Sequence, residues 1–470
     1  MPAPMMGPYP WSGGFRSLEQ EHDGRVEDVE GSVPAWLRGT LFRNGSGRND
    51  LAGQWFPHWF DGDGMIQAIR FDERGIHYRN RYVATPNYRD ETAAGRIRHR
   101  GFGKMRPGGL LANAFRQPAN VSNTSVVMES GQLLSLWEGG PPYEIDPATL
   151  ETRGVADFGG ALKAFSAHPK RDPATGELFN FGIDYGSKTT LTPYRVHRGT
   201  VTTLPAVTLP YPLMNHDFVL TEHHLVFCLG PILLRSLKMI LGLESFDGAL
   251  HWDGGKPTLI LLIRRDGTGP PRIIETDAFF QFHFANGYEQ DGGVVLDLMR
   301  YPDFSVIGPT LRDYWRSAWP AKGMAALTRL RADLATGKVD TRTFDTGSAN
   351  EFPGINPARV GRPYRFAYLA CNPAQRAQGL QQQIARVDFD SGAVAIHDFG
   401  PTFYPGEPVF ISGGGTAEDD GVIVTLVFDS ASGLSSIVGL DARDLAARPL
   451  FTARLAHHVP YSLHGTFAAS

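Results

Sequence analysis

The stretch IARVDFDSGAVAIHDFG, Ile384 to Gly400, places two runs of strand-forming residues on either side of a short turn that contains Asp, Ser and Gly. An Asp side chain accepts a backbone hydrogen bond from within its own turn, and Gly takes the left-handed conformation without steric cost. The stretch therefore predicts a β-hairpin.

The same pattern recurs along the chain. It is found in YEIDPATLETRGV (143–155), AHPKRDPATGELFNFG (167–182) and IVGLDARDLAARPLFTARL (437–455). Repeated hairpins without a strict short period are typical of a β-propeller, in which each blade buries its faces against its neighbours. With about four strands and about 50 to 65 residues per blade, the chain accommodates six to eight blades.

The 54 glycines and 34 prolines are scattered through the 470 residues, and no linker-like composition divides them. We therefore predict an all-β fold and a single propeller domain over residues 1–470. Helical periodicity is confined to two stretches, which we expect as insertions between strands: Ile232 to Leu243 and Ala321 to Leu334.

Composition excludes several classes of function. The 45 basic and 49 acidic residues leave a formal charge of -4, which offers no basic surface for nucleic acid. Two cysteines, Cys228 and Cys371, are too few for a disulfide scaffold or a thiolate metal site. We found neither a secretory signal nor a run of about 20 apolar residues, and no segment indicates an obligate protein partner. We expect a cytoplasmic protein.

Four of the 15 histidines lie at strand ends beside small, turn-forming or aromatic residues: His168, His216, His283 and His464. One such histidine is more often a hydrogen-bonded core residue than a ligand. They are too widely spaced for a zinc finger, but the inner strands of a propeller bring distant residues to one axis. A site made of neutral imidazoles suits iron, copper, nickel or zinc.

Three glutamates lie in apolar or turn-rich surroundings: Glu138, Glu351 and Glu407. A carboxylate buried among Phe, Pro and Ile is costly unless it is paired or hydrogen-bonded. Metal-binding histidines commonly donate their second ring N–H to carboxylates. The three glutamates therefore support a buried cationic centre.

Ten segments in order resemble the signatures of carotenoid cleavage oxygenases, from about Gly14 to Phe467. They are GTLFRNGSG, WFDGDGM, LWEGGPPYEIDPATLET, AHPKRDPATGE, NHDFVLTE, FHFANGYE, EFPGINP, PGEPVFI, EDDGVIVTLVFD and HGTF. The resemblance implies a seven-bladed β-propeller whose helical and loop insertions form a cap over an axial metal site.

The resemblance also implies the composition of that site. Fe(II) would be held by His168, His216, His283 and His464, and the outer carboxylates would be Glu138, Glu351 and Glu407. His168 would be the histidine without a glutamate partner. Thr124, in an NT pair, would stand near an open coordination position where O2 binds.

The activity that this family implies is oxidative cleavage of one C=C bond of a carotenoid or apocarotenoid into two carbonyl fragments. The polyene supplies the electrons, so no organic cofactor is expected. For the wall of the substrate tunnel we expect Trp137, Phe282 and Phe284.

Other activities are compatible with the same framework. Lignostilbene dioxygenases are similar in sequence, and isomerases or a non-catalytic lipid-binding propeller are further alternatives. Stilbene cleavers carry a lysine before the first glutamate and a tyrosine upstream, whereas this chain has Trp137 before Glu138 and offers Lys104 and Met105 upstream. An indole at that position favours a hydrocarbon chain.

The segment GPILLRSLKMILGL, residues 230–243, combines apolar residues with Arg235 and Lys238. Its composition is typical of a core helix, but the similar apolar patch at the tunnel mouth of the family favours peripheral attachment to a membrane. We expect the membrane-facing residues to be Ile232, Leu233, Leu234, Leu237, Ile240 and Leu241.

Overall fold

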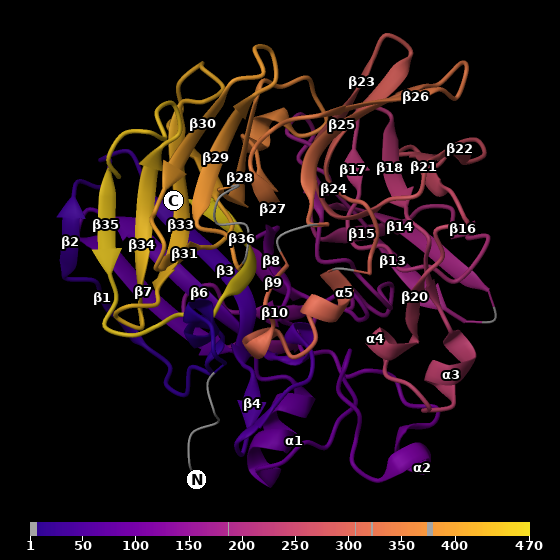
Figure 1. The fold of residues 1–470 in the computed structure, drawn as a ribbon, viewed down its shortest axis with the longest axis horizontal. Helices are drawn as coiled ribbons and strands as arrows, with labels where there is room; N and C mark the ends of the chain where they lie inside the picture. Colours follow the sequence, from indigo (N-terminus) through magenta and orange to yellow (C-terminus); the bar gives the residue numbers. More distant parts are fainter. Residues whose placement is uncertain (1–6, 187, 306, 321–322, 374–378) are drawn as a thin grey trace.

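The computed structural model describes residues 7–186, 188–305, 307–320, 323–373 and 379–470. In these ranges, seven antiparallel sheets of four to six strands surround a common centre (Figure 1). Two small two-stranded sheets accompany them. The seven sheets are the blades of a β-propeller, so the expected fold is confirmed.

Each blade is a run of strands that pair edge to edge. In order of pairing, blade 1 comprises β1 (Asp23–Arg25), β7 (Gly75–Tyr82), β6 (Asp63–Asp72), β3 (Gly39–Arg48) and β36 (Ser462–Ala469). Blade 2 comprises β11 (Thr152–Val155), β10 (Tyr143–Ile145), β9 (Gln132–Leu136) and β8 (Ser125–Glu129). Blade 3 comprises β12 (Lys170–Arg171), β13 (Leu178–Tyr185), β14 (Thr189–His197) and β15 (Thr200–Thr203), with β16 (Val207–Thr208) also on β14.

Blade 4 comprises β17 (Val219–Leu220), β18 (His224–Leu229), β21 (Thr258–Arg264) and β22 (Arg272–Thr276). Blade 5 comprises β23 (Phe280–Gln290), β24 (Gly293–Tyr301), β25 (Ala326–Asp333) and β26 (Val339–Thr343). Blade 6 comprises β27 (Ser348–Gly354), β28 (Phe366–Asn372), β29 (Gln383–Asp388) and β30 (Val394–Asp398). Blade 7 comprises β2 (Asp28–Gly31), β35 (Phe451–Arg454), β34 (Leu434–Asp441), β33 (Gly421–Asp429) and β31 (Phe403–Pro405), with β32 (Val409–Ser412) also on β33.

The ring is closed twice. Strand β36, late in the chain, pairs with β3 in blade 1, and the early strand β2 pairs with β35 in blade 7. Each closure joins segments that are far apart in sequence. Blade 1 is completed by a strand from the end of the chain, and blade 7 is completed by a strand from its beginning.

The predicted hairpin forms between β29 and β30. The Oδ1 atom of Asp388 accepts hydrogen bonds from the backbone N–H groups of Asp390 and Ser391, and Gly392 adopts φ +75°. The turn chemistry inferred from the sequence is therefore the chemistry that sets the register of this hairpin.

Segments inserted between strands cover one end of the propeller. The helices in these segments are α1 (Pro86–Ala94), α2 (Gly109–Asn113), α3 (Ser236–Ile240), α4 (Phe246–Ala249) and α5 (Ile307–Thr310). Elsewhere or beside them, the described chain forms the 3-10 turns η1 (Pro10–Phe15), η2 (Trp59–Asp61), η3 (Tyr314–Arg316) and η4 (Pro357–Arg359). The small sheets are β4 (Asp50–Leu51) with β5 (Gln54–Trp55), and β19 (Ile232–Leu234) with β20 (Leu250–Trp252). Helices α1 and α2 lie at the lower edge of Figure 1, with α3 and α4 above them on the right. The predicted cap is thus present.

The prediction of a helix over residues 321–334 is wrong. Residues 321 and 322 lie outside the described part, and Ala326–Asp333 is strand β25, paired with β24 on one side and β26 on the other. Pairing on both edges outweighs the helical propensity of this sequence, because propensity is a weak prior against tertiary contacts.

The helix predicted over residues 232–243 forms only in part. Ile232–Leu234 is strand β19, and Ile232 and Leu234 are 0% and 2% exposed within the core. Leu233 is half-buried and pairs with His251 in β20. Only Ser236–Ile240 is helical. The assignment of Ile232 and Leu234 to a membrane-facing surface is therefore wrong, since pairing with β20 turns them inward.

Candidate metal centre and adjoining cavity

The four predicted histidines converge at the centre of the propeller. His464 lies on β36 and His283 on β23, while His168 and His216 lie two and three residues before β12 and β17. Their ligand atoms all lie within 4.8 Å of one another, and all four side chains are buried or nearly so. Each lies on, or shortly before, the strand at the end of a different blade.

The distances between these rings match the requirements of one shared cation. The Nε2 atoms are 2.8 Å apart between His168 and His216, 3.3 Å between His216 and His283, and 3.1 Å between His283 and His464. Imidazole nitrogens bind first-row metals at about 2.1 Å, which puts neighbouring ligand atoms about 3 Å apart at right angles. The four rings fit a single ion.

The second ring nitrogen of three of the histidines, Nδ1, is paired with a glutamate carboxylate. Nδ1 of His216 lies 3.0 Å from Glu138, Nδ1 of His283 lies 2.6 Å from Glu351, and Nδ1 of His464 lies 2.8 Å from Glu407. A carboxylate only accepts, so Nδ1 carries the proton and Nε2 presents a lone pair. Lone pairs that face one another at such short distances repel unless a cation lies between them. The donor set therefore fits a metal ion.

The three glutamates have different supports of their own. Glu351 accepts a hydrogen bond of 2.5 Å from the Tyr301 hydroxyl, and Glu407 is ion-paired with the fully buried Arg43. Glu138 is partly exposed and borders the cavity. Phe352, directly after Glu351, adopts φ 54°, an uncommon conformation for a bulky residue and one often associated with functional sites.

Electrostatics keep most of this cluster in the form that binds a cation. Burial, reinforced by the neighbouring rings, holds the pKa of His168 well below its usual range, and burial lowers the pKa of His464 to about 4. Burial also disfavours the charged form of His216, but Glu138 outweighs it and raises the pKa. Burial opposes ionisation of Glu407, yet Arg43 and His464 outweigh it and lower the pKa.

Every blade contributes to this centre. Blades 1, 3, 4 and 5 provide the histidines, and blades 6 and 7 provide Glu351 and Glu407. Blade 2 provides Thr124, just before β8, and Glu138, shortly after β9. Thr124 lies beside the cavity and its hydroxyl donates to Asn123, so it offers the cavity no free proton donor.

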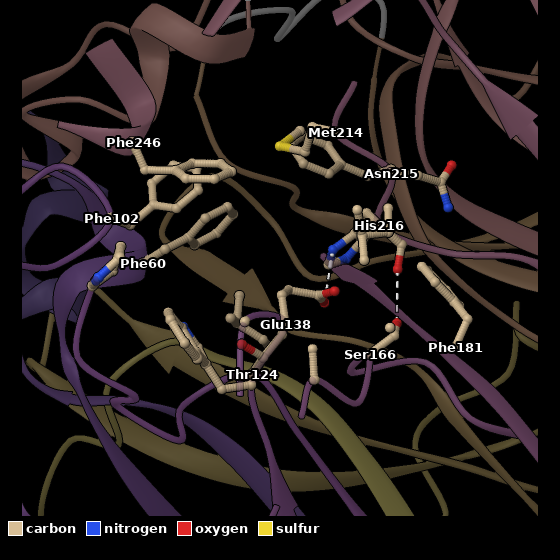
Figure 2. Close-up of a pocket in the computed structure, with 18 of the residues that line it drawn as sticks. Phe60, Phe102, Thr124, Glu138, Ser166, Phe181, Met214, Asn215, His216 and Phe246 are labelled. Carbon is tan, nitrogen blue, oxygen red and sulfur yellow. Dashed lines mark hydrogen bonds and ion pairs between the residues drawn. The ribbon is translucent and has the colours of Figure 1, made fainter. Parts of the chain in front are cut away.

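A cavity of about 850 Å³ opens from three of the histidines, His216, His283 and His464. Figure 2 shows Phe60, Phe102 and Phe246 grouped on one side and His216 with Glu138 on the other. The inserted segments supply Phe102, Phe246 and Ile240, so the cap forms part of the wall. Such a volume with mostly apolar walls suits one extended apolar small molecule.

Two of the three expected tunnel residues line this cavity, namely Trp137 and Phe282. Phe284 does not; it packs in another cluster with Val219 and Leu298. The register of β23 against β24 shifts between Gln281 and Phe284, where an extra residue forms a bulge. The bulge breaks the alternation of side chains, which lets Phe282 and His283 both reach the cavity and turns Phe284 away.

Sequence reasoning missed the residues that support the glutamates and histidines, including Arg43, Tyr301, Lys170 and Asp217. Arg43 lies within GTLFRNGSG and Asp217 within NHDF, two of the recognised segments. A charged residue inside an otherwise apolar or glycine-rich segment was the available signal, because an unpaired buried charge is costly.

A β-propeller with four axial histidines, three of them bound to glutamates, defines a class of protein built around a histidine-only candidate metal centre. The chain matches the family described as retinal pigment epithelial membrane protein over residues 15–469. It therefore belongs to that family, which includes the carotenoid cleavage oxygenases. The resemblance inferred from the sequence is confirmed.

Curated relatives cover nearly the whole chain. Apocarotenoid-15,15'-oxygenase of Synechocystis sp. is 35% identical over 98% of this chain and 96% of that protein. Carotenoid 9,10(9',10')-cleavage dioxygenase 1 of Arabidopsis thaliana is 28% identical, with 97% and 89% covered. Isoeugenol monooxygenase of Pseudomonas putida is 29% identical, with 93% of each covered. The crystal structure of cobalt-substituted Synechocystis ACO superposes with a TM-score of 0.91 at 34% identity, over 98% of each chain.

Proposed function

We propose that this protein is a non-haem Fe(II) dioxygenase that cleaves one C=C bond of an apocarotenoid or carotenoid into two carbonyl fragments. The observation that carries the proposal is the junction of the four-histidine centre with the apolar cavity of about 850 Å³. Relatives named for the cleavage of apocarotenoids and carotenoids support it.

In this proposal His168, His216, His283 and His464 hold the ion, and Fe(II), when bound, supplies the activation of O2. Glu138, Glu351 and Glu407 fix the orientation of three rings and keep the proton on Nδ1. The cavity wall excludes water and presents the double bond to the centre. Phe282, which packs edge to face against His216 at 5.5 Å, would keep the polyene beside the rings.

The cavity wall next to Glu138 favours a polyene over a phenol as the substrate. Trp137 lines the cavity, whereas Lys104 is buried and ion-paired with Glu91 at 3.1 Å, so Lys104 is not free to bind a phenolate. Stilbene or isoeugenol cleavage is the second candidate. It is favoured by the relative from Pseudomonas putida and by Lys163, a cation at the cavity wall.

Chromatography of the products tests the choice. The protein loaded with Fe(II) is incubated with apocarotenals, a carotenoid, resveratrol and isoeugenol at matched detergent concentration. We expect two carbonyl fragments from an apocarotenal, and no product from the His283→Ala variant. Faster turnover of resveratrol or isoeugenol than of any apocarotenal contradicts the substrate assignment and supports the second candidate.

We further propose that the cap docks on a membrane surface through an exposed apolar patch. None of the helices in the described parts of the chain has the length and hydropathy needed to cross a bilayer. Of the six residues expected in this role, Leu237 and Leu241 are exposed, and Ile240 is half-buried and lines the cavity. The patch as the structure has it comprises Leu110, Leu111, Phe115, Leu237, Leu241 and Leu243.

Two observations support this patch as an entrance. The backbone N–H of Phe115 donates to the carbonyl of Ile240, so the α2 and α3 parts of the patch are joined. Gln117 and Pro118, just after Phe115, line the cavity together with Ile240. An apolar substrate could therefore pass from the lipid into the cavity without crossing water.

A further inference from the structure

We infer that Asp217 is a positioning residue that aligns three of the four histidine-bearing segments, and that Lys170 prevents its carboxylate from becoming a direct partner of His168. The inference rests on the proposed function only in that the histidines bind a metal ion. It adds a carboxylate that is hydrogen-bonded to none of the histidine rings and instead contacts residues close to the histidines in sequence.

Asp217 is 1% exposed and directly follows His216. Its Oδ2 atom accepts a hydrogen bond of 2.9 Å from the backbone N–H of Phe284, the residue after His283. Its Oδ1 atom accepts from Lys170 Nζ at 2.8 Å, and Lys170 lies two residues after His168. One side chain therefore contacts the segments of His168, His216 and His283, which belong to blades 3, 4 and 5.

The position of these contacts argues for alignment rather than general stabilisation. Phe284 lies within the bulged part of β23, where the pairing with β24 shifts register on both sides of it. Strand β23 is the edge strand of blade 5, so some of its backbone N–H groups have no ladder partner, and Asp217 accepts the one that Phe284 presents between the two register shifts. The carboxylate thus fixes the bulge that turns His283 toward the centre.

A second link between the same blades runs beside Asp217. The Ser166 hydroxyl donates to the carbonyl of His216 at 3.1 Å, and the backbone N–H of His168 donates to the same hydroxyl at 3.3 Å. These contacts carry no charge. Asp217 and Lys170 are therefore the ionic part of the link between the His168 and His216 segments.

Lys170 also keeps the Asp217 carboxylate from forming a hydrogen bond with His168. Nδ1 of His168 lies 3.9 Å from Oδ1 of Asp217, which is beyond hydrogen-bonding distance. The same oxygen already accepts from Lys170 and from the backbone N–H of Phe218 at 2.7 Å. Without the lysine, a small shift would bring the carboxylate onto His168, and all four rings would then have an anionic partner.

Titration of the metal-free protein with Co²⁺, followed by the visible absorption of the bound ion, tests the inference without any substrate. Asp217→Asn keeps the shape of the side chain and removes its charge. We expect it to weaken Co²⁺ binding by about 10- to 100-fold and to change the absorption spectrum, as for other residues that orient ligands. Lys170→Met should shift the spectrum without loss of affinity.

Asp63→Asn is the matched control, because Asp63 is fully buried, ion-paired with Arg48 and located on β6, which β3 separates from the histidine-bearing strand β36. It should lower the melting temperature and leave Co²⁺ affinity and spectrum unchanged. Wild-type affinity and spectrum in Asp217→Asn overturn the role of Asp217, and an unchanged spectrum in Lys170→Met overturns that of Lys170. If Asp217→Asn does not fold, the spectrum of Lys170→Met tests whether the Asp217–Lys170 ion pair acts on the metal site. An unchanged spectrum then overturns the roles of both residues. Failure of the wild-type protein to bind one Co²⁺ contradicts the proposed function instead.

Discussion

The hydroxyl of Tyr301 donates a hydrogen bond of 2.5 Å to one oxygen of Glu351, while the other oxygen accepts from His283 at 2.6 Å. Burial, together with the charge of Glu351, holds the pKa of Tyr301 well above its usual range, so the phenol remains a donor throughout the physiological range of pH. The hydrogen bond from Tyr301 holds the Glu351 carboxylate in place, and the carboxylate in turn orients the His283 ring.

Tyr301→Phe should therefore weaken metal binding while the ring still fills its place in the cavity wall. Loss of a buried hydrogen bond to a charged group should cost about 1.5 to 3 kcal/mol of unfolding free energy. Tyr364→Phe is the control, since its hydroxyl makes a 2.7 Å bond to Asp297 away from the centre. Equal metal content in the two variants by elemental analysis would show that Tyr301 serves stability alone.

Glu351→Gln and Glu407→Gln should each weaken metal binding by about 10- to 100-fold. Their effects on stability should differ, because Glu407 is the counter-ion of the buried Arg43, whereas no lysine or arginine in the described part of the chain is ion-paired with Glu351. An uncompensated buried charge costs about 3 to 5 kcal/mol. Melting temperatures of the metal-free variants should therefore fall further for Glu407→Gln. The reverse order would contradict this pairing.

Asp61, within WFDGDGM, should make the stability of the protein depend on pH. Burial, opposed in part by Lys104, raises its pKa to about 6 from an ordinary value of 3.8. The folded state then binds a proton that the unfolded state has released, so this contribution is complete below pH 3.8 and is lost as the pH rises through about 6. Relative to Asp61→Asn, the wild-type protein should lose about 3 kcal/mol over that interval. Urea unfolding at several pH values measures it, and a constant difference would refute the shift.

Replacement of Leu111, Phe115 and Leu237 with Ser should abolish sedimentation with liposomes and leave the melting temperature unchanged. These side chains are 91%, 79% and 69% exposed, so they contribute little to the core. Ile273→Ser, on a blade edge and 51% exposed, is a control that should retain binding. Leu234→Ser, at 2% exposure, should instead destabilise the fold. Undiminished liposome binding by the triple variant would exclude the patch.

The local parts of this structure were predictable and the long-range parts were not. Asp388 and Gly392 sit in a turn whose chemistry is contained in a few consecutive residues, so the hairpin could be predicted from them. The number of blades and the ligand set came from family resemblance, because the spacing of the histidines alone left several metals and six to eight blades open. The β25 strand was missed because its stability lies in its two neighbours.

Phe284 illustrates why the cavity wall could not be predicted fully. Regular alternation along β23 puts neighbouring residues on opposite faces, and the register shifts on both sides of Phe284 change which side chains face the centre. Asp217 was missed for a related reason: its partners Lys170 and Phe284 lie in other blades. Such a contact becomes visible only when the blades are placed side by side.

The closing strand β36 also sets the order of events during synthesis. It brings His464 into blade 1, beside β3, although the other three histidines belong to blades made earlier. A ribosome-bound chain that already contains His168, His216 and His283 still lacks the fourth ring and the last strand of blade 1. Completion of blade 1 and completion of the ligand set are therefore one step, so metal capture by all four histidines must follow the emergence of β36 from the exit tunnel.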